Sequence, residues 1–414
     1  MIYDICVIGL GYIGVPTAAI FADSGKKVLG VDVLEKRVSL INSGTSHVGE
    51  SDINAMIAKV VKSGNLKAAS KPESAEYYIV AVPTPFKKDH NKKLPDMGFV
   101  EAATRSIAPV LKDGQCIILE STSPVGTTGE MKKWLKDELD KIGRSAEVDY
   151  STIEFAHCPE RILPGRMLSE LVGNDRIVGG MTPKTSQRVG KLYKSFCKGE
   201  IFLTDDRTAE MAKLTENASR DVQIAFANEL SIVCDKLGID VWELIRLANR
   251  HPRVKILNPG PGVGGHCIAV DPWFIISAAE SQTPLMRAAR EVNDGKPGWV
   301  IAKVAEAVSR CKKNNPKIAC LGLTFKADVN DVRESPAIKI VEALSHFDDC
   351  VVLISEPNIV EMPLTLAGYA NFSPKEAVSK ADIVLLLVDH KQFSSISPDD
   401  LSGKILIDTK GFFK

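Results

Sequence analysis

Cys267 follows a loop rich in glycine and proline. Glycines stand at positions 260, 262, 264 and 265 of the segment PGPGVGGHC, and glycine lets a backbone approach a ligand closely. If Cys267 opens a helix, the helix N-terminus would favour its thiolate and make it a nucleophile. Asp271, four residues later, would then share a helical face with it. The alternative is an inert thiol, since most cysteines in such a chain are small buried hydrophobes.

A second group of polar residues has helical spacing. Lys213, Asn217 and Arg220 lie at positions i, i+4 and i+7 of a long helical pattern, which places them on one face. Two cations and an amide there could hold an anionic or polyhydroxylated ligand, and a partly buried lysine can transfer a proton. The alternative is that these residues form a solvated face of the helix that binds no ligand, and the pattern taken alone favours it.

The sequence begins with a nucleotide-binding pattern. An apolar run at 5–8 and a helical run at 16–22 flank three glycines, and Asp32 ends the next apolar run. The three glycines are Gly9, Gly11 and Gly14. In a βαβ unit they allow a tight turn, close approach of a pyrophosphate and close helix packing, while the acidic residue binds ribose hydroxyls.

The carboxylate of Asp32 would repel a 2′-phosphate, so we expect NAD rather than NADP as the cofactor. Lys36 and Arg37 argue against this, but we expect them on a solvated surface. Thr84 and Thr122 each follow an apolar strand, and ligands gather at the carboxyl ends of parallel strands. Ordinary turn chemistry explains these two threonines equally well.

Apolar and helical runs predict the elements that position these residues. The α/β alternation of the first half and of the last hundred residues predicts two doubly wound, Rossmann-like domains, joined by an all-helical middle domain with a long central helix. The expected boundaries are 1–204, 205–300 and 301–414. Expected strands include 77–82, 116–119, 317–323, 350–354, 383–388 and 404–407, and expected helices include 55–63, 131–139, 208–237, 241–248, 286–292 and 337–345.

Composition excludes several classes of function. The chain has 414 residues with 52 basic and 52 acidic side chains, which argues against nucleic acid or an anionic membrane as the main partner. No apolar run approaches the length of a membrane span, and the N-terminus does not read as a signal peptide.

The nine cysteines are widely spaced and form no CxxC pair, which argues against a disulfide framework and a zinc site and favours a reducing cytoplasm. His266 beside Cys267 has no partner at zinc spacing, so we expect no metal. His157 and Cys158 are expected to be a buried core pair.

With these residues in view, the chain resembles the UDP-glucose/GDP-mannose dehydrogenase family along essentially its whole length. The motifs that carry the resemblance are GLGYIG at 9–14, AVPTPF at 81–86, ESTSPVGTT at 120–128, CPERILPG at 158–165, NDRIVGGMTP at 174–183, TAEMAKLTENASRD at 208–221, ELIRLANRHPRV at 243–254, PGPGVGGHCIAVDPWF at 259–274 and GLTFKADVNDVRESP at 322–336.

The resemblance implies an NAD-dependent, four-electron oxidation of a nucleotide sugar by a homodimer. Cys267 matches the thiol that captures the aldehyde as a thiohemiacetal and carries the later thioester. Lys213 and Asn217 match residues that stabilise the oxyanion. Asp271 matches a residue that orients a water or polarises its neighbours, and Glu160 matches a proposed base in thioester hydrolysis.

The resemblance also implies binding residues. For NAD they are Gly9, Gly11, Tyr12, Ile13, Gly14, Asp32, Thr84, Thr122 and Arg333. For the nucleotide sugar they are Arg161, Ile162, Lys213, Asn217, Arg220, His251, Arg253, Gly264, Phe325 and Lys326.

One departure bears on the sugar. Members of the family that oxidise UDP-glucose have an aromatic PEF stretch with a second glutamate soon after, whereas this chain has PERILP at 159–164. This departure argues against UDP-glucose and favours an N-acetylated hexosamine. The resemblance implies UDP-N-acetyl-D-mannosamine as substrate, with its gluco epimer as the close alternative. A two-electron hydroxyacid dehydrogenase, which would not need Cys267, and an NAD-binding sensor are the more distant alternatives.

Overall fold

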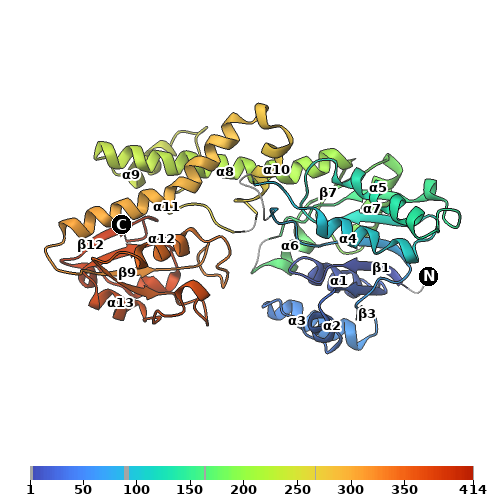
Figure 1. The fold of residues 1–414 in the computed structure, drawn as a ribbon, viewed down its shortest axis with the longest axis horizontal. Coiled ribbons are helices and arrows are strands. Elements are labelled where there is room, and N and C mark those ends of the chain that lie inside the picture. Colours follow the sequence, from blue (N-terminus) through green and yellow to red (C-terminus); the bar gives the residue numbers. More distant parts are fainter. Residues whose placement is uncertain (1–2, 88–92, 163–164, 266, 414) are drawn as a thin grey trace. The chain divides into compact units, whose positions relative to one another are not determined.

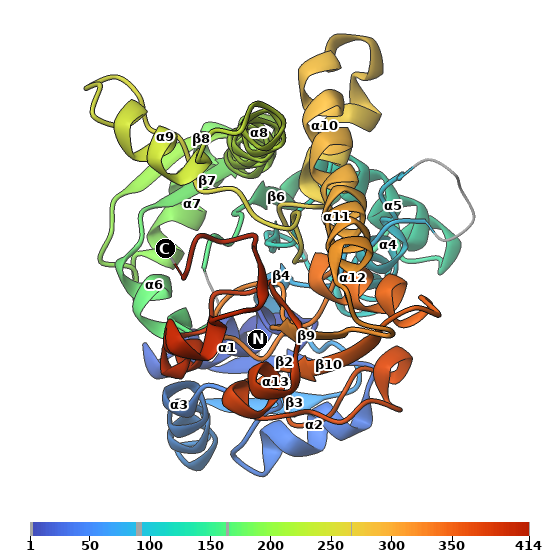
Figure 2. The same cartoon turned by 90° about the vertical axis from the view of Figure 1, so that its left-hand side faces the viewer.

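The computed structural model describes residues 3–87, 93–162, 165–265 and 267–413, which form two compact units (Figures 1 and 2). The N-terminal unit contains residues 1–215 and 273–278, and the C-terminal unit contains residues 216–272 and 279–414.

The N-terminal unit is built on an eight-stranded sheet of order β3-β2-β1-β4-β5-β6-β7-β8. Its strands are β1 (Tyr3–Ile8), β2 (Val28–Val31), β3 (Leu66–Ala69), β4 (Ala75–Val80), β5 (Cys116–Leu119), β6 (Glu154–His157), β7 (Arg176–Gly180) and β8 (Ile201–Asp205). Its helices are α1 (Gly14–Asp23), α2 (Glu35–Asn42), α3 (Ser51–Lys62), α4 (Gly98–Arg105), α5 (Thr127–Lys141), α6 (Met167–Gly173) and α7 (Pro183–Tyr193). The strand pairs are parallel except β6 with β7, which is antiparallel. Helices α1, α3 and α7 cover one face of the sheet and α4 and α5 the other, whereas the edge strand β8 is half-buried to exposed.

Helices form the middle of the chain, and two of them, α8 and α11, are long. They are α8 (Asp206–Leu237), α9 (Val241–Ala248), α10 (Asp271–Ala278) and α11 (Pro284–Arg310). The predicted end of α11 near residue 292 is wrong, because the helix continues through Pro297. Its buried face, which includes Asn293, Lys296 and Val300, packs at helical spacing and offsets the cost of proline.

The C-terminal unit ends in a four-stranded parallel sheet of order β10-β9-β11-β12. Its strands are β9 (Lys317–Leu321), β10 (Val351–Ser355), β11 (Ile383–Leu386) and β12 (Ile405–Asp408), and its helices are α12 (Pro336–Ser345) and α13 (Pro374–Lys380). In Figure 2, α11 and α12 lie on one side of this sheet and α13 on the other, in agreement with the two buried clusters. Two doubly wound sheets joined by helices confirm the predicted fold class.

Burial agrees with the cysteine analysis. Six thiols are buried, namely Cys6, Cys116, Cys158, Cys197, Cys234 and Cys320, whereas Cys267 is exposed. His157 is fully buried beside Cys158 and burial lowers its pKa to about 3, so the predicted core pair is confirmed. Within the described ranges, no helix combines the length and apolar character needed to cross a membrane.

Candidate active site

The glycine turn after β1 has the predicted geometry. Gly9 has a φ of 98°, and a Cβ there would lie 2.4 Å from the carbonyl oxygen of Ala81. A Cβ at Gly14 would lie 1.7 Å from the carbonyl oxygen of Gly9. By contrast, a Cβ at Gly11 would meet no atom within 4 Å. The turn is a tight cradle with an open side at the N-terminus of α1, which is what a pyrophosphate requires.

Asp32, directly after β2, is buried and lies against this turn. Its carboxylate accepts hydrogen bonds from the backbone N–H groups of Leu10 and Leu34, each at 2.9 Å. The guanidinium of Arg37 donates to the same carboxylate at 3.1 Å. Lys36 is exposed, as predicted. Arg37 is about a third exposed (34%), since its guanidinium contacts the buried carboxylate.

The other predicted cofactor residues of this unit lie in loops after neighbouring parallel strands. Thr84 follows β4 and is buried, and Thr122 follows β5 and is half-buried. The side chain of Ser121 joins these two loops by accepting from the N–H of Val82 at 2.8 Å. Tyr12 is exposed in the glycine turn and Ile13 beside it is half-buried. These residues therefore gather at one edge of the sheet.

A buried acidic cluster that sequence reasoning missed lies behind this edge. Glu120 accepts hydrogen bonds from the hydroxyls of Thr17, at 2.9 Å, and Tyr193, at 3.3 Å. Burial and the charge of Glu160 raise the pKa of Glu120 to about 8. Glu160 itself pairs with Arg176 at 2.9 Å, and both side chains are less than a tenth exposed. A base role for Glu160 would therefore require it to act beside a buried guanidinium.

The two residues after Glu160 face different surroundings. Arg161 is half-buried and donates to the carbonyl oxygen of Asp175, and Ile162 packs against the first core of the sheet. Leu163 and Pro164, which complete the predicted motif, lie outside the described residues.

Helix α8 carries the predicted polar face. Lys213 is buried, Asn217 is half-buried and Arg220 is exposed. Glu210, one turn before Lys213, accepts from the N–H and hydroxyl of Thr128, at 2.8 and 2.7 Å, and from the N–H of Gly126. The start of α8 is thus anchored to the N-terminus of α5, in the N-terminal unit.

Asn217 and Asp271 are brought together in the C-terminal unit. The side-chain amide of Asn217 donates to the carboxylate of Asp271 at 2.5 Å. Asp271 is the first residue of α10 and is only 3% exposed. The two predicted catalytic residues are therefore held in a fixed relative orientation by their own contact.

Cys267 lies in a turn just before α10. Its carbonyl oxygen accepts from the N–H groups of Val270, at 3.0 Å, and Asp271, at 2.8 Å. The thiol belongs to an exposed residue, and it precedes the helix rather than opening it. His266 lies outside the described residues.

The glycines before Cys267 are needed because Phe325 packs on them. A Cβ at Gly264 would lie 3.0 Å from the Cβ of Phe325, and one at Gly265 would lie 2.9 Å from its ring. The N–H of Gly265 donates to the carbonyl oxygen of Arg333 at 3.2 Å. The structure therefore brings Gly264 and Phe325 together. Gly264 is three residues before Cys267 in the sequence. Lys326 follows on the same loop and is exposed.

A buried polar network holds the other end of the glycine loop. The N–H of Gly260 donates to Asn228 at 2.9 Å, and Asn228 donates to Asn293 at 2.9 Å. Asn293 donates to Asp221 at 2.8 Å, and Arg290 donates to the same carboxylate at 2.6 Å. These residues join α8 and α11 to the loop. Sequence reasoning missed them, because each is one polar residue in a helical run.

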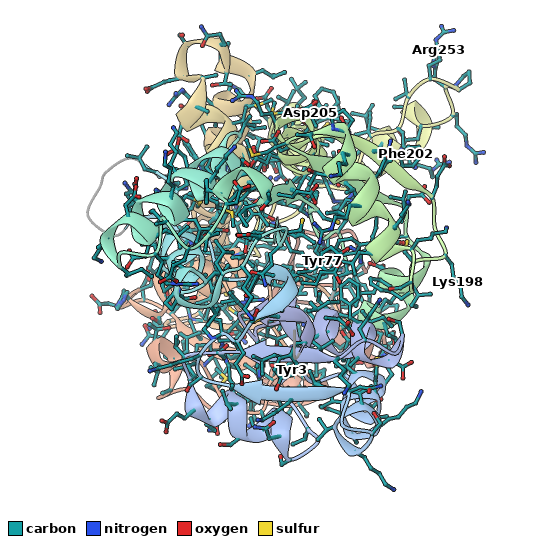
Figure 3. All side chains as sticks on the ribbon, turned by 90° about the vertical axis from the view of Figure 1, so that its right-hand side faces the viewer. Tyr3, Tyr77, Lys198, Phe202, Asp205 and Arg253 are labelled. Carbon is teal, nitrogen blue, oxygen red and sulfur yellow. The ribbon has the colours of Figure 1, made fainter. Side chains whose placement is uncertain are left out.

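The remaining predicted binding residues lie at the surface of the C-terminal unit. His251 and Arg253 are exposed in the loop that follows α9, with Arg253 at its tip in Figure 3. Arg333 is exposed, and its guanidinium donates three hydrogen bonds to the carboxylate of Asp331, at 3.0, 3.1 and 2.6 Å.

The residues of the N-terminal unit fit a dinucleotide, since the cradle excludes side chains, opens at Gly11 and faces a buried carboxylate at Asp32. Among the side chains that the structure describes, there is no group of three or more His, Cys, Asp or Glu suited to a metal ion.

Comparisons with known proteins agree with this geometry. Residues 3–197, 207–295 and 319–414 match the NAD binding domain, the central domain and the UDP binding domain of the UDP-glucose/GDP-mannose dehydrogenase family. The predicted cofactor, NAD, is thereby confirmed.

Similar proteins span the whole chain. A UDP-N-acetyl-D-mannosamine dehydrogenase of Yersinia pestis is 51% identical over 99% of both chains. An NDP-N-acetyl-D-galactosaminuronic acid dehydrogenase of Ralstonia nicotianae is 52% identical over 99% of this chain and 96% of that one. The solved structure of a UDP-D-ManNAc dehydrogenase from Pyrococcus horikoshii is 38% identical and has a TM-score of 0.87, covering 99% of this chain and 96% of that one. The chain is thus an NAD-dependent nucleotide-sugar dehydrogenase and belongs to the UDP-glucose/GDP-mannose dehydrogenase family.

Proposed function

We propose that the protein oxidises the primary alcohol of UDP-N-acetyl-D-mannosamine to a carboxylate, giving UDP-N-acetyl-D-mannosaminuronate. The observation that carries this proposal is the 51% identity, over 99% of both chains, with the Yersinia pestis dehydrogenase named for that sugar. The match of residues 319–414 to a UDP binding domain supports the nucleotide part of the substrate.

Cys267 would carry the chemistry of the second oxidation. When bound, NAD⁺ accepts one hydride in each of the two oxidations. The thiolate adds to the carbonyl carbon of the intermediate aldehyde, so that a sulfur–carbon bond forms and the oxygen takes a proton. This thiohemiacetal has a tetrahedral carbon that can release a hydride, and loss of the hydroxyl proton then leaves a thioester. Water cleaves the sulfur–carbon bond to give the acid and the thiol.

Other side chains would stabilise charge and move protons around this carbon. Lys213 and Asn217 are proposed to donate hydrogen bonds to the oxyanion, with Lys213 also transferring a proton. The contact between Asn217 and Asp271 supports a role for Asp271 in orienting the amide. Glu160 remains the candidate base in hydrolysis.

The binding residues are proposed as two sets. Gly9, Gly11, Tyr12, Ile13, Gly14, Asp32, Thr84, Thr122 and Arg333 are proposed to hold NAD. Arg161, Ile162, Lys213, Asn217, Arg220, His251, Arg253, Gly264, Phe325 and Lys326 are proposed to hold the nucleotide sugar, where the cations suit a diphosphate.

We also propose a homodimer that works in the cytoplasm. Exposed apolar side chains on α8, namely Phe226, Val233 and Leu237, recur at i, i+7 and i+11 and support an interface along that helix. Nine thiols without a disulfide support a reducing compartment. We propose further that the chain has three domains, with boundaries at residues 204 and 300.

The homodimer can be tested by placing a charge at position 226. Phe226→Asp should convert the dimer to a monomer in light scattering.

A second candidate substrate is UDP-N-acetyl-D-galactosamine, because a relative of similar identity is named for N-acetyl-D-galactosaminuronic acid. The gluco epimer is the third. The test is incubation of the purified protein with each UDP-N-acetylhexosamine and NAD⁺, with NADH counted and the product mass measured. We expect two NADH per UDP-N-acetylmannosamine and the mass of the acid. Preferred turnover of another UDP-N-acetylhexosamine would overturn the choice of sugar, and one NADH per substrate would indicate a two-electron dehydrogenase.

A further inference from the structure

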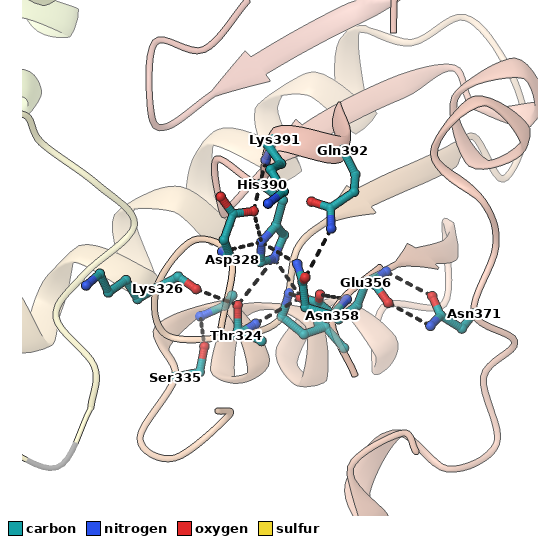
Figure 4. Close-up of polar contacts among 12 residues, drawn as sticks. Thr324, Lys326, Asp328, Ser335, Glu356, Asn358, Asn371, His390, Lys391 and Gln392 are labelled. Carbon is teal, nitrogen blue, oxygen red and sulfur yellow. Dashed lines mark hydrogen bonds and ion pairs between the residues drawn. The ribbon is translucent and has the colours of Figure 1, made fainter. Parts of the chain in front are cut away.

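The crevice at the switch point of the C-terminal sheet is filled by the chain's own side chains. The strand order reverses at β9, with β10 on one side of it and β11 and β12 on the other, and ligands of such sheets bind outside the carboxyl ends of the strands at that point. Thr324 follows β9, Glu356 follows β10 and His390 follows β11, and all three are less than 2% exposed. Figure 4 shows their side chains in contact.

Glu356 holds the turn that leaves β9. Its carboxylate accepts from the N–H groups of Leu323, at 2.6 Å, and Thr324, at 3.1 Å. It also lies 3.0 Å from the Nε2 of His390. Burial opposes ionisation, but the hydrogen bond from His390 and those from the backbone lower the pKa of Glu356, so the carboxylate is charged.

The contacts of His390 fix its tautomer. Its Nδ1 accepts from the N–H of Asp328 at 3.0 Å and lies 2.8 Å from the amide nitrogen of Asn358. Since Nδ1 is an acceptor, Nε2 carries the proton and shares it between Glu356 and the hydroxyl of Thr324, at 3.2 Å. Asp328 has a φ of 58°, a backbone conformation that is unfavourable outside glycine, and the bond to His390 holds it there.

The same imidazole is connected to Lys326 through one side chain. The hydroxyl of Thr324 donates to the carbonyl oxygen of Lys326 at 2.8 Å and closes the turn. His390 therefore contacts residues on both sides of Lys326, namely Thr324 and Asp328. In Figure 4 the side chain of Lys326 points away from His390, so the buried network anchors the backbone and leaves the ammonium outside.

We propose that His390 is a positioning residue for nucleotide-sugar binding: it holds the turn from Thr324 to Asp328 so that Lys326 is presented to the diphosphate. The proposal rests on the proposed function, in which Lys326 binds the substrate. It also accounts for the polar filling of this crevice, which takes the place that a nucleotide occupies in a ligand-binding sheet. The side chains that fill the crevice thereby support the loop that carries Lys326.

A double-mutant cycle tests the proposal in the full-length protein. UDP affinity would be measured by calorimetry for the wild type, His390→Ala, Lys326→Ala and the double variant. We expect His390→Ala and Lys326→Ala each to weaken UDP binding about tenfold, as for one charge-assisted hydrogen bond. The double variant should be no weaker than Lys326→Ala alone, because His390 acts through Lys326. His390→Gln, whose amide can still donate to Glu356, should recover part of the affinity.

Val378→Ala is the matched control. Val378 of α13 is fully buried in the cluster on the face of the sheet opposite α11 and α12. Its truncation should therefore destabilise the C-terminal unit without changing the turn from Thr324 to Asp328. It should leave UDP affinity unchanged, and KM for NAD⁺ should be unchanged in all variants. Additive effects of His390→Ala and Lys326→Ala, or a His390→Ala affinity equal to that of Val378→Ala, would overturn the proposal. A wild type that binds UDP but oxidises no UDP-sugar would instead overturn the proposed function, and the cycle on UDP affinity would still decide the role of His390.

Discussion

Asp32 and Glu356 make the same contact in the two sheets. Asp32 follows β2 and accepts the N–H of Leu10, in the turn after β1, at 2.9 Å. Glu356 follows β10 and accepts the N–H of Leu323, in the turn after β9, at 2.6 Å. In both halves, an acidic residue at the end of one strand holds the turn that leaves the neighbouring strand.

The two turns differ in what lies beside them. The N-terminal turn is open at Gly11, where a ligand can approach the backbone. The C-terminal turn is covered by His390, which bonds to Glu356 itself. One sheet therefore keeps a dinucleotide cradle, whereas the other uses the same position to support a loop.

The first prediction concerns the carboxylate of the N-terminal turn. Asp32→Ala should raise KM for NAD⁺ about tenfold or more, because it removes an acceptor for ribose hydroxyls and the bond that holds Leu10. KM for the UDP-sugar should change little. Steady-state kinetics with each substrate varied would check this. Arg37→Ala, which removes the neighbouring cation but keeps the carboxylate, is the control, and an equal rise in both KM values for Asp32→Ala would contradict the assignment.

The second prediction concerns the thiol. Cys267→Ser should lower turnover to the acid by at least about a thousandfold, because a hydroxyl is a far weaker nucleophile than a thiolate at neutral pH. The variant should stop with covalent or aldehyde-level product, which mass spectrometry can detect. Cys311→Ser changes a half-buried thiol elsewhere and should leave the rate unchanged. Normal turnover of Cys267→Ser would rule out the covalent mechanism.

Most helices and strands could be predicted from the sequence, because the residue patterns that indicate them are local. The glycine turn at 9–14, the face of α8 and the strands of the last sheet each depend on residues close together in the sequence. The end of α11 could not be predicted in the same way. Gly295, Pro297 and Gly298 argue against a helix locally, and only the buried contacts of Asn293 and Lys296 with α8 decide in its favour.

The buried polar residues that hold the loops of the site could not be predicted from the sequence. Glu356 and His390 are 34 positions apart, and Asn228 and Asn293 are 65 apart, so each residue read alone is one polar side chain beside an apolar run. The glycine spacing before Cys267 did predict a close approach, but the partner that approaches includes Phe325, a side chain of the protein itself.

The third prediction tests the contact between Asn217 and Asp271. Asn217→Asp should destabilise the protein more than Asn217→Ala, by about 1–3 kcal/mol, because it places a second carboxylate against a buried one. Adding Asp271→Asn should restore much of that loss by reversing the donor and the acceptor. Denaturant unfolding of the three variants would measure the differences. Equal stability of Asn217→Asp and Asn217→Ala would show that the two side chains do not interact in solution.

The fourth prediction concerns Lys296, a buried lysine of α11. It is 2% exposed, donates to the hydroxyl of Ser231 at 2.6 Å and lies 3.7 Å from the centre of the Trp299 ring. Burial lowers the pKa of Lys296 to about 7. Between about pH 7 and the unfolded pKa of about 10.4, the native state binds fewer protons than the unfolded state. The free energy of unfolding should therefore rise with pH across this window, with a slope of up to about 1.4 kcal/mol per pH unit from this residue.

Lys296→Met should remove that slope, because methionine fills a similar volume and has no proton to lose. Lys303 supplies the control on the same helix, since its hydrogen bonds with Asp235 and Glu306 raise its pKa rather than lower it. Lys303→Met should leave the slope between about pH 7 and 10 intact, because the contribution of Lys303 is present throughout that range and is lost only above it. Parallel stability curves for the wild type and Lys296→Met would contradict the prediction and would mean that Lys296 is solvated in the native protein.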